Sequence, residues 1–102
     1  MPIYWGYIIL VRVTFDPAKR EATLRSRGVD FWHAEFVFEG PTLTTEDVRF
    51  AYGEPRFQTI GFLSGRMVMV VWTPRGDARH IISMRKCNAR EQKTYGRRFE
   101  ET

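Results

Sequence analysis

The chain has 102 residues, enough for one domain with a modest core and too few for separate cofactor and substrate domains. Hydrophobic residues make up 43% of it and aromatic residues 15%, which argues against disorder over most of the length. The formal net charge is +4, carried by 13 arginines against 3 lysines. This arginine bias suits phosphate recognition and interfaces, although a GC-rich coding sequence with arginines on solvated faces would give the same count.

Cys87 is the only cysteine, so the sequence excludes an internal disulfide and a cysteine-rich metal site. With only His33 and His80 as imidazole ligands, we expect no metal and no cofactor. The apolar run 4–13 contains Arg12, is too short to span a bilayer, and lacks the features of a signal peptide. We therefore expect a cytoplasmic protein that is not bound to a membrane.

The first predicted elements are a strand and a helix. Residues 8–15 are rich in β-branched side chains and predict a strand. Asp16 and Pro17 are the residue types of a helix N-terminus, because Asp16 caps free amides and Pro17 has no N–H to satisfy. The helix is expected to end near Arg27, with Gly28 as a left-handed C-cap.

A second helix is predicted over 31–38, capped by Asp30 and ended by the Gly-Pro pair at 40–41. Its apolar stripe has helical spacing and consists of Phe31, Ala34, Val37 and Phe38. Residues 41–55 are expected to form a loop, with a possible short strand at 42–45. A loop of this length in a small domain is either functional or mobile.

The second half of the chain predicts three consecutive strands and a last helix. The strands span 56–63, 67–73 and 78–86, with turns at 64–65 and 74–77. The middle strand is apolar on both faces, which is typical of a central strand. Asn88 begins the last helix with Glu91 as its capping-box partner, and we expect this helix to fray beyond Tyr95. The predicted fold is α+β: a small antiparallel sheet (strand, two helices, three-strand meander) and a C-terminal helix, with the helices against one face.

Arg79, Ser83 and Arg85 are the first candidates for an anion site. Their spacings of four and two place them on one face of a regularly alternating strand. Arg85 is the expected phosphate ligand and Arg79 the second, against the alternative that both are solvated strand-end arginines. Ser83 either adds a hydrogen bond or is a buried serine satisfied by backbone.

His80 is the candidate for proton transfer, because histidine titrates near neutral pH. Regular alternation places it with Ile82 and Met84, opposite the arginines, unless a β-bulge realigns the strand. The alternative is a histidine packed at the sheet edge.

Three residues before and within the second strand complete the candidate site. Glu54 is either a general base or, as we favour, an ion-pair partner that fixes the loop through Arg56. Tyr52 either stacks on a base or packs over the loop. Arg56, Ser83 and Tyr52 are thus the expected substrate-binding residues, beside Arg85, His80, Arg79 and Glu54 as catalytic candidates.

Several short segments in register resemble the BrnT family. They are Phe15-Asp16-Pro17-Ala18-Lys19, Arg27-Gly28-Val29-Asp30-Phe31, Tyr52-Gly53-Glu54-Pro55-Arg56-Phe57, Arg75-Gly76-Asp77 and Ile81-Ile82-Ser83-Met84-Arg85, followed by Arg90-Glu91. The likeness covers roughly residues 13–95 of a single domain spanning 1–102. Residues 1–10 precede the usual family start, either as an added strand edge or as an upstream translation extension with Val11 at the usual start.

This resemblance implies a RelE-like fold and a ribonuclease toxin of a type II toxin–antitoxin pair that arrests translation. It also implies a BrnA-like, DNA-binding antitoxin, so that the chain would form a hetero-oligomer and meet operator DNA only through that partner. Three positions depart from many relatives: Thr23 stands in place of Asn, Arg27 in place of His, and His80 in place of Arg. The last lies in the candidate site.

Three functions remain open from the sequence. The first is metal-independent RNA cleavage by phosphodiester transfer, in which arginines stabilise the charge gained by the phosphate. The second is a non-catalytic nucleic-acid-binding module. The third is an inactive toxin relic that acts only in an operon-repressing complex, an alternative that the change at His80 keeps open.

Overall fold

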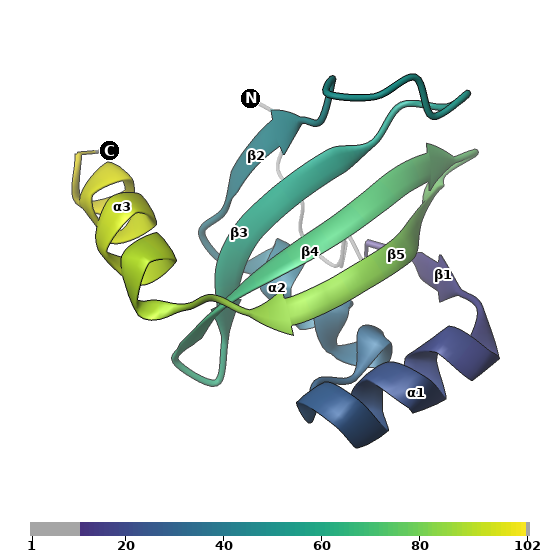
Figure 1. Cartoon of the computed structure of the whole chain (residues 1–102), viewed down its shortest axis with the longest axis horizontal. Coiled ribbons are helices and arrows are strands. Elements are labelled where there is room, and N and C mark those ends of the chain that lie inside the picture. Colours follow the sequence, from purple (N-terminus) through teal and green to yellow (C-terminus); the bar gives the residue numbers. More distant parts are fainter. Residues whose placement is uncertain (1–10, 102) are drawn as a thin grey trace, which may run out of the picture.

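The structure is a computed structural model that describes residues 11–101, and Figure 1 shows its five-stranded sheet and three α-helices. The strands are β1 (Val13–Phe15), β2 (Leu43–Glu46), β3 (Phe57–Leu63), β4 (Arg66–Arg75) and β5 (Ala78–Lys86). The helices are α1 (Pro17–Arg27), the 3₁₀ turn η1 (Phe31–His33), α2 (Ala34–Glu39) and α3 (Ala89–Glu100). The predicted α+β class is therefore confirmed, while residues 8–10 of the expected first strand lie outside the described part of the chain.

Local sequence signals set the bounds of the first helix. The Asp16 carboxylate accepts a hydrogen bond of 2.9 Å from the backbone N–H of Ala18. At the other end Gly28 adopts a φ of 70° and donates its N–H to the Leu24 carbonyl at 3.0 Å. A left-handed C-cap strongly favours glycine because it has no Cβ to clash. Both predicted caps are confirmed.

The sheet is mixed rather than antiparallel, and its strand order is β1-β5-β4-β3-β2. The pairs among β2, β3, β4 and β5 are antiparallel, whereas β1 runs parallel to β5. This parallel pair was not predicted, because a strand's partner is not encoded in its own pattern. The apolar β4 is the central strand, as its residues predicted.

The main core lies between the sheet and the η1–α2 segment. Phe31, Ala34 and Val37 have no exposed surface and pack with Val70 and Met84 of the sheet. The predicted apolar stripe of the second helix is therefore confirmed, with its first turn as a 3₁₀ helix. Truncating such a side chain, as in Phe31→Ala, typically costs about 3–5 kcal/mol of unfolding free energy.

The opposite sheet face carries a second apolar cluster, with α3 beside one end of the sheet in Figure 1. There Tyr95 and Phe99 of α3 pack against a buried group formed by Ile60, Met67, Met69 and Cys87. The expectation that all helices lie against one face is therefore wrong. The helix also continues to Glu100 and does not fray beyond Tyr95, since Phe99 lies one turn further on and packs with the same cluster.

A β-bulge in β5 changes which side chains share a face. Val71 pairs with Ser83, but the next residue of β4, Trp72, pairs with Ile81, so that Ile82 is the extra residue. Ile81 therefore lies on the helix-covered face with Met84, whereas His80 and Ser83 lie on the other face. We call this second face the open face: it is opposite α2, and Figure 1 looks directly onto it.

Candidate functional site

Four polar side chains form a row across the open face at the end of the sheet away from α3. Thr14 of β1 pairs with His80 of β5, and His80 pairs with Thr73 of β4. The β3–β4 register, in which Phe57 pairs with Trp72, places Arg56 opposite Thr73 on the same face. The row of Thr14, His80, Thr73 and Arg56 thus brings a hydroxyl, an imidazole and a guanidinium side by side.

The His80 ring is oriented by a hydrogen bond of 2.9 Å between its Nδ1 and the Thr14 hydroxyl. Its Nε2 has no hydrogen-bond partner among the described residues. Partial burial, followed by the positive charge of Arg75, lowers the pKa of His80 below its usual value of 6.5. The ring is therefore neutral at pH 7, and Nε2 can accept a proton when Nδ1 carries the hydrogen.

Arg56 lies at the other end of the row, with Thr73 of β4 between it and His80. Its guanidinium lies over the Tyr52 ring, with 4.0 Å from Cζ to the centroid, and makes no ion pair within the described residues. Its Nε and the Thr73 hydroxyl are both buried without a hydrogen-bond partner among residues 11–101. Buried polar atoms are rarely left unsatisfied, so these two mark a polar interior beneath the surface at this end of the row.

Glu54 and Arg75 supply further charges near the row. They form an ion pair, with 3.8 Å between Arg75 Nη2 and Glu54 Oε1. The favoured pairing of Glu54 with Arg56 is therefore wrong. Glu54 raises and Arg75 lowers the pKa of His80, which means that both charges act on its ring.

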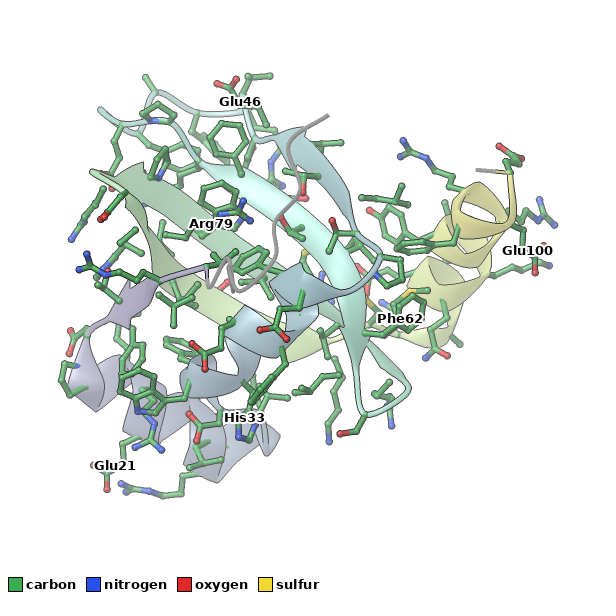
Figure 2. The ribbon with its side chains drawn as sticks, turned by 180° about the vertical axis from the view of Figure 1, so that it is seen from behind. Glu21, His33, Glu46, Phe62, Arg79 and Glu100 are labelled. Carbon is green, nitrogen blue, oxygen red and sulfur yellow. The ribbon has the colours of Figure 1, made fainter. Side chains whose placement is uncertain are left out.

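Arg79 lies on the other face of the sheet. Its guanidinium is 4.3 Å from the ring centroid of Phe38 and 4.5 Å from that of Trp72, on the helix side seen in Figure 2. Burial lowers its pKa without abolishing its charge. The prediction that Arg79 shares a face with Ser83 and Arg85 is wrong, because the bulge at Ile82 interrupts the alternation between them.

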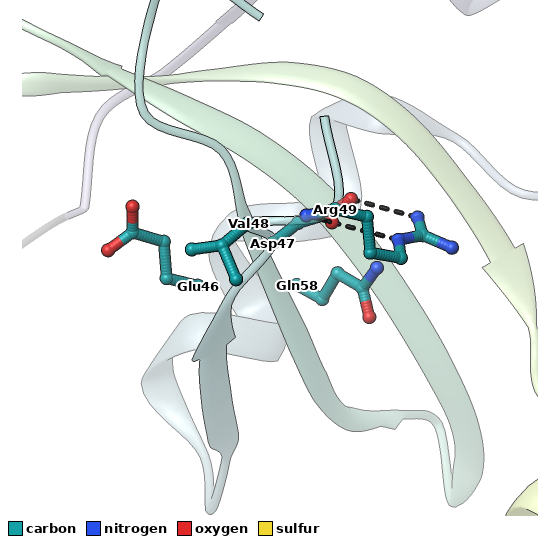
Figure 3. Close-up of a pocket in the computed structure, with 5 residues that line it drawn as sticks. All are labelled: Glu46, Asp47, Val48, Arg49 and Gln58. Atoms are coloured by element: carbon teal, nitrogen blue, oxygen red, sulfur yellow. Dashed lines mark hydrogen bonds and ion pairs between the residues drawn. The ribbon is translucent and has the colours of Figure 1, made fainter. Parts of the chain in front are cut away.

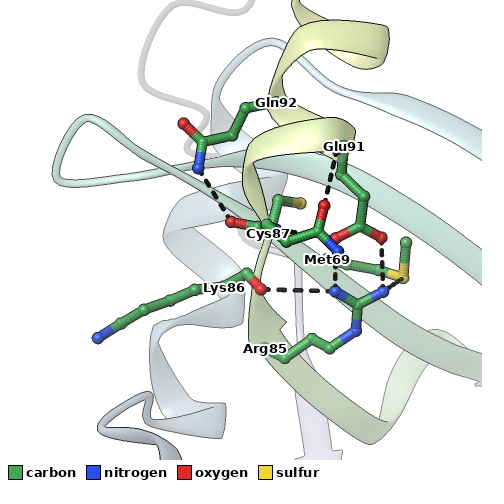
Figure 4. Close-up of polar contacts among 7 residues, drawn as sticks. Met69, Arg85, Lys86, Cys87, Glu91 and Gln92 are labelled. Atoms are coloured by element: carbon green, nitrogen blue, oxygen red, sulfur yellow. Dashed lines mark hydrogen bonds and ion pairs between the residues drawn. The ribbon is translucent and has the colours of Figure 1, made fainter.

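Arg85 lies on the open face but at the end occupied by α3. Its Nη1 and Nη2 each donate a hydrogen bond of 2.7 Å to Glu91 of α3, as Figure 4 shows. The Arg85 guanidinium lowers the pKa of Glu91 to about 2. Arg85 is five positions after His80 in β5, which places the two residues roughly 15 Å apart along the strand. They therefore do not share a site.

Two predicted substrate-binding residues remain to be placed, Ser83 and Tyr52. Ser83 is half-buried on the open face, one row closer to His80 than Arg85 is, and pairs with Val71. Tyr52 packs against Arg56 and donates its hydroxyl to Asp47 at 3.0 Å. The structure therefore places Glu54 and Arg75 near His80, packs Tyr52 against Arg56 further along the row, and leaves Arg85 and Arg79 apart from both groups.

The loop after β2 is held by the buried Asp47 carboxylate. Figure 3 shows its two hydrogen bonds of 2.9 Å with the guanidinium of Arg49, beside a pocket of about 230 Å³. These bonds lower the pKa of Asp47 and raise that of Arg49. The pocket is lined by Glu46, Asp47, Val48, Arg49 and Gln58. It lies beside the Arg56 end of the row, since Gln58 is two residues along β3 on the same face.

Sequence reasoning missed Thr14, Thr73 and Arg75. Arg75 falls two residues after Thr73 in β4, so regular alternation would have placed both on one face. The position of Thr14 beside His80 could not be predicted from the sequence, because it depends on the parallel pairing of β1 with β5. The Cys87 thiol is buried beside α3, where burial raises its pKa, in agreement with a structural role at the strand end.

The chain is thus a small α+β protein whose open sheet face carries an oriented, neutral histidine near two charged side chains, Arg75 and Glu54. The comparison with known families identifies it further. The model of the ribonuclease toxin BrnT, of type II toxin–antitoxin systems, matches residues 15–91, and the chain belongs to this family. No curated protein matches the chain. Within residues 11–101, no helix has the length and apolar character needed to cross a membrane.

Proposed function

We propose that the chain is a ribonuclease toxin that cleaves RNA by metal-independent phosphodiester transfer at the row of Thr14, His80, Thr73 and Arg56. Membership of the BrnT family supports the reaction class. The observation that supports the location is the neutral His80 ring, whose Nδ1 is held by Thr14 and which lies within reach of the charges of Arg75 and Glu54.

In the proposed reaction the 2′-hydroxyl of the substrate attacks the adjacent phosphate. His80 Nε2 accepts the proton of that hydroxyl, while Thr14 holds Nδ1. Arg56 and Arg75 stabilise the additional negative charge of the five-coordinate phosphate, which is the largest electrostatic change in the reaction. The 5′-oxygen leaves and takes a proton from solvent, and the strand ends in a 2′,3′-cyclic phosphate.

Glu54 is proposed as a positioning residue for Arg75, its ion-pair partner at 3.8 Å. We also propose that RNA cleavage arrests translation and that a BrnA-like antitoxin neutralises the toxin in a hetero-oligomer. Any contact with operator DNA would then come from the antitoxin. The cationic open face is the surface that such a partner would have to cover.

The test is cleavage of RNA by the purified chain in excess EDTA. We expect products with 2′,3′-cyclic phosphate ends, and a loss of about 100-fold or more in kcat/KM for His80→Ala, as is usual for a general base. Arg56→Ala should lose activity as well. Arg66→Ala is the matched control, because Arg66 is an exposed arginine at the far end of β4. RNA binding without cleavage would indicate the non-catalytic module instead, and full activity of His80→Ala would refute the site.

A further inference from the structure

The loop between β2 and β3 presents two large apolar side chains to solvent. Phe50 is 66% exposed and Val48 is 76% exposed. Single exposed apolar residues are common and need no explanation. Here, however, the loop is held by the buried carboxylate of Asp47, which accepts hydrogen bonds from Arg49 and from the Tyr52 hydroxyl. The exposed phenylalanine therefore lies between two residues anchored to one carboxylate.

Phe50 belongs to a series of contacting groups that we call the aromatic ladder: Arg49, Phe50, Tyr52 and Arg56. The Arg49 guanidinium is 5.7 Å from the Phe50 centroid, and the Phe50 and Tyr52 rings are 5.8 Å apart at 72°. The Arg56 guanidinium then lies 4.0 Å from the Tyr52 centroid. The ladder thus runs from the exposed loop to Arg56, which ends the row, with Thr73 between it and His80.

Aromatic rings flanked by arginines are groups that suit the binding of unpaired nucleotides. Bases stack on aromatic faces, and guanidinium groups stack on rings and contact phosphates. In a paired A-form helix the bases are stacked within the duplex and their faces are not available to a protein side chain. The exposed face of Phe50 therefore favours a single strand.

We propose that the aromatic ladder is the binding track for single-stranded RNA on one side of the scissile phosphate, with a nucleobase stacked on Phe50. This inference rests on the proposed function, since it takes the row at His80 as the place of cleavage. It adds a substrate class, unpaired RNA, and a residue, Phe50, that contacts the substrate outside the reacting group.

A second exposed aromatic group on the molecule provides the control. Phe36 is 53% exposed on α2, on the side of the sheet opposite the open face, between Glu35 and Val37 in the sequence. Substituting Phe36 removes a comparable exposed ring without touching the ladder. Phe36→Ser is therefore the matched control for Phe50→Ser, and Phe50→Trp should preserve stacking.

The experiment measures binding of a short, fluorescently labelled 2′-O-methyl oligonucleotide, which lacks the attacking hydroxyl and stays intact. We expect Phe50→Ser to weaken binding by about 5- to 100-fold, the range found for loss of one base–aromatic stack. Phe50→Trp and Phe36→Ser should bind like the wild type. A duplex of the same sequence should bind more weakly and should not distinguish wild type from Phe50→Ser. Circular dichroism melting verifies that each variant is folded.

Equal binding of the single strand by wild type and Phe50→Ser would overturn the proposal. So would an equal loss in Phe36→Ser, or a Phe50→Ser variant that loses binding only to the antitoxin, which would make the ladder a protein-docking surface. The binding result and the cleavage result can differ, so the experiment distinguishes failure of this inference from failure of the proposed ribonuclease function. A chain that binds the probe through Phe50 but cleaves no RNA would retain the ladder and refute the ribonuclease site.

Discussion

Substituting Arg85, the ion-pair partner of Glu91, tests whether this residue stabilises the fold or binds the substrate phosphate. Sequence spacing made Arg85 the leading phosphate ligand, whereas its guanidinium is joined to Glu91 by two hydrogen bonds of 2.7 Å. These bonds connect β5 to the first turn of α3. We therefore expect Arg85→Ala to reduce stability and leave the cleavage of RNA largely intact.

The magnitude follows from the burial of the two partners. Hydrogen bonds to charged groups contribute about 1.5–3 kcal/mol when shielded from water. Arg85 is 38% exposed and Glu91 19% exposed, so solvent screening reduces the contribution of this pair to about 1–2 kcal/mol. For a domain of this size that corresponds to a fall in Tm of roughly 5–15 °C.

The assay is thermal unfolding followed by circular dichroism, together with cleavage at a temperature where both proteins are folded. Glu91→Gln is the companion variant. It removes the charge but keeps a side chain that can accept from the Asn88 N–H in the capping box, so a smaller loss is expected. If Arg85→Ala abolished cleavage without changing Tm, the structural role would be refuted and the assignment of Arg85 as a phosphate ligand restored.

Three further outcomes follow from the structure. Because burial and Arg75 lower the pKa of His80 below 6.5, the proposed general base should give a kcat/KM that rises with pH with a half-maximum below pH 6.5; a half-maximum above pH 6.5 would contradict this. Because the folded-state pKa of Glu91 is about 2, its stabilising contribution should be complete above its ordinary value of 4.5 and be lost as the pH falls toward 2, as measured by urea unfolding with Glu91→Gln as the insensitive control. Gly61→Ala should cost about 1–3 kcal/mol, since the new Cβ would lie 2.6 Å from Val37 Cγ1, whereas Gly96→Ala in α3 meets no atom and should stabilise the chain by about 0.5–1 kcal/mol; equal melting temperatures would contradict the expectation.

Features fixed by neighbouring residues could be predicted from the sequence. The Asp16 cap, the left-handed Gly28 and the capping box of Asn88 and Glu91 are each made within a few residues of chain, and all three are present. The central strand was also predictable, because it is apolar on both faces. The predicted fraying beyond Tyr95 is wrong because Phe99, one turn further on, packs against the same cluster as Tyr95 and holds the last turn of α3.

Features that depend on distant partners could not be predicted in this way. The bulge at Ile82 can be recognised only from the pairing of β5 with β4. Because of this bulge, His80 rather than Arg79 lies on the same sheet face as Ser83. The hydrogen bond between Thr14 and His80 requires two strands that are 66 residues apart in the chain. The sequence therefore indicated His80 and Arg56 of the row but not Thr14 or Thr73. It also placed His80 and Arg79 on the wrong faces relative to Ser83.

The extra residue in β5, Ile82, should change the pattern of positions at which this strand tolerates polar substitutions. In a regular strand, positions that accept polar side chains alternate with positions that reject them from one end to the other. Here a saturation scan should find that Ile81 and Met84, three positions apart, both reject polar side chains while Ser83 accepts them, so that the alternation shifts phase by one position at Ile82.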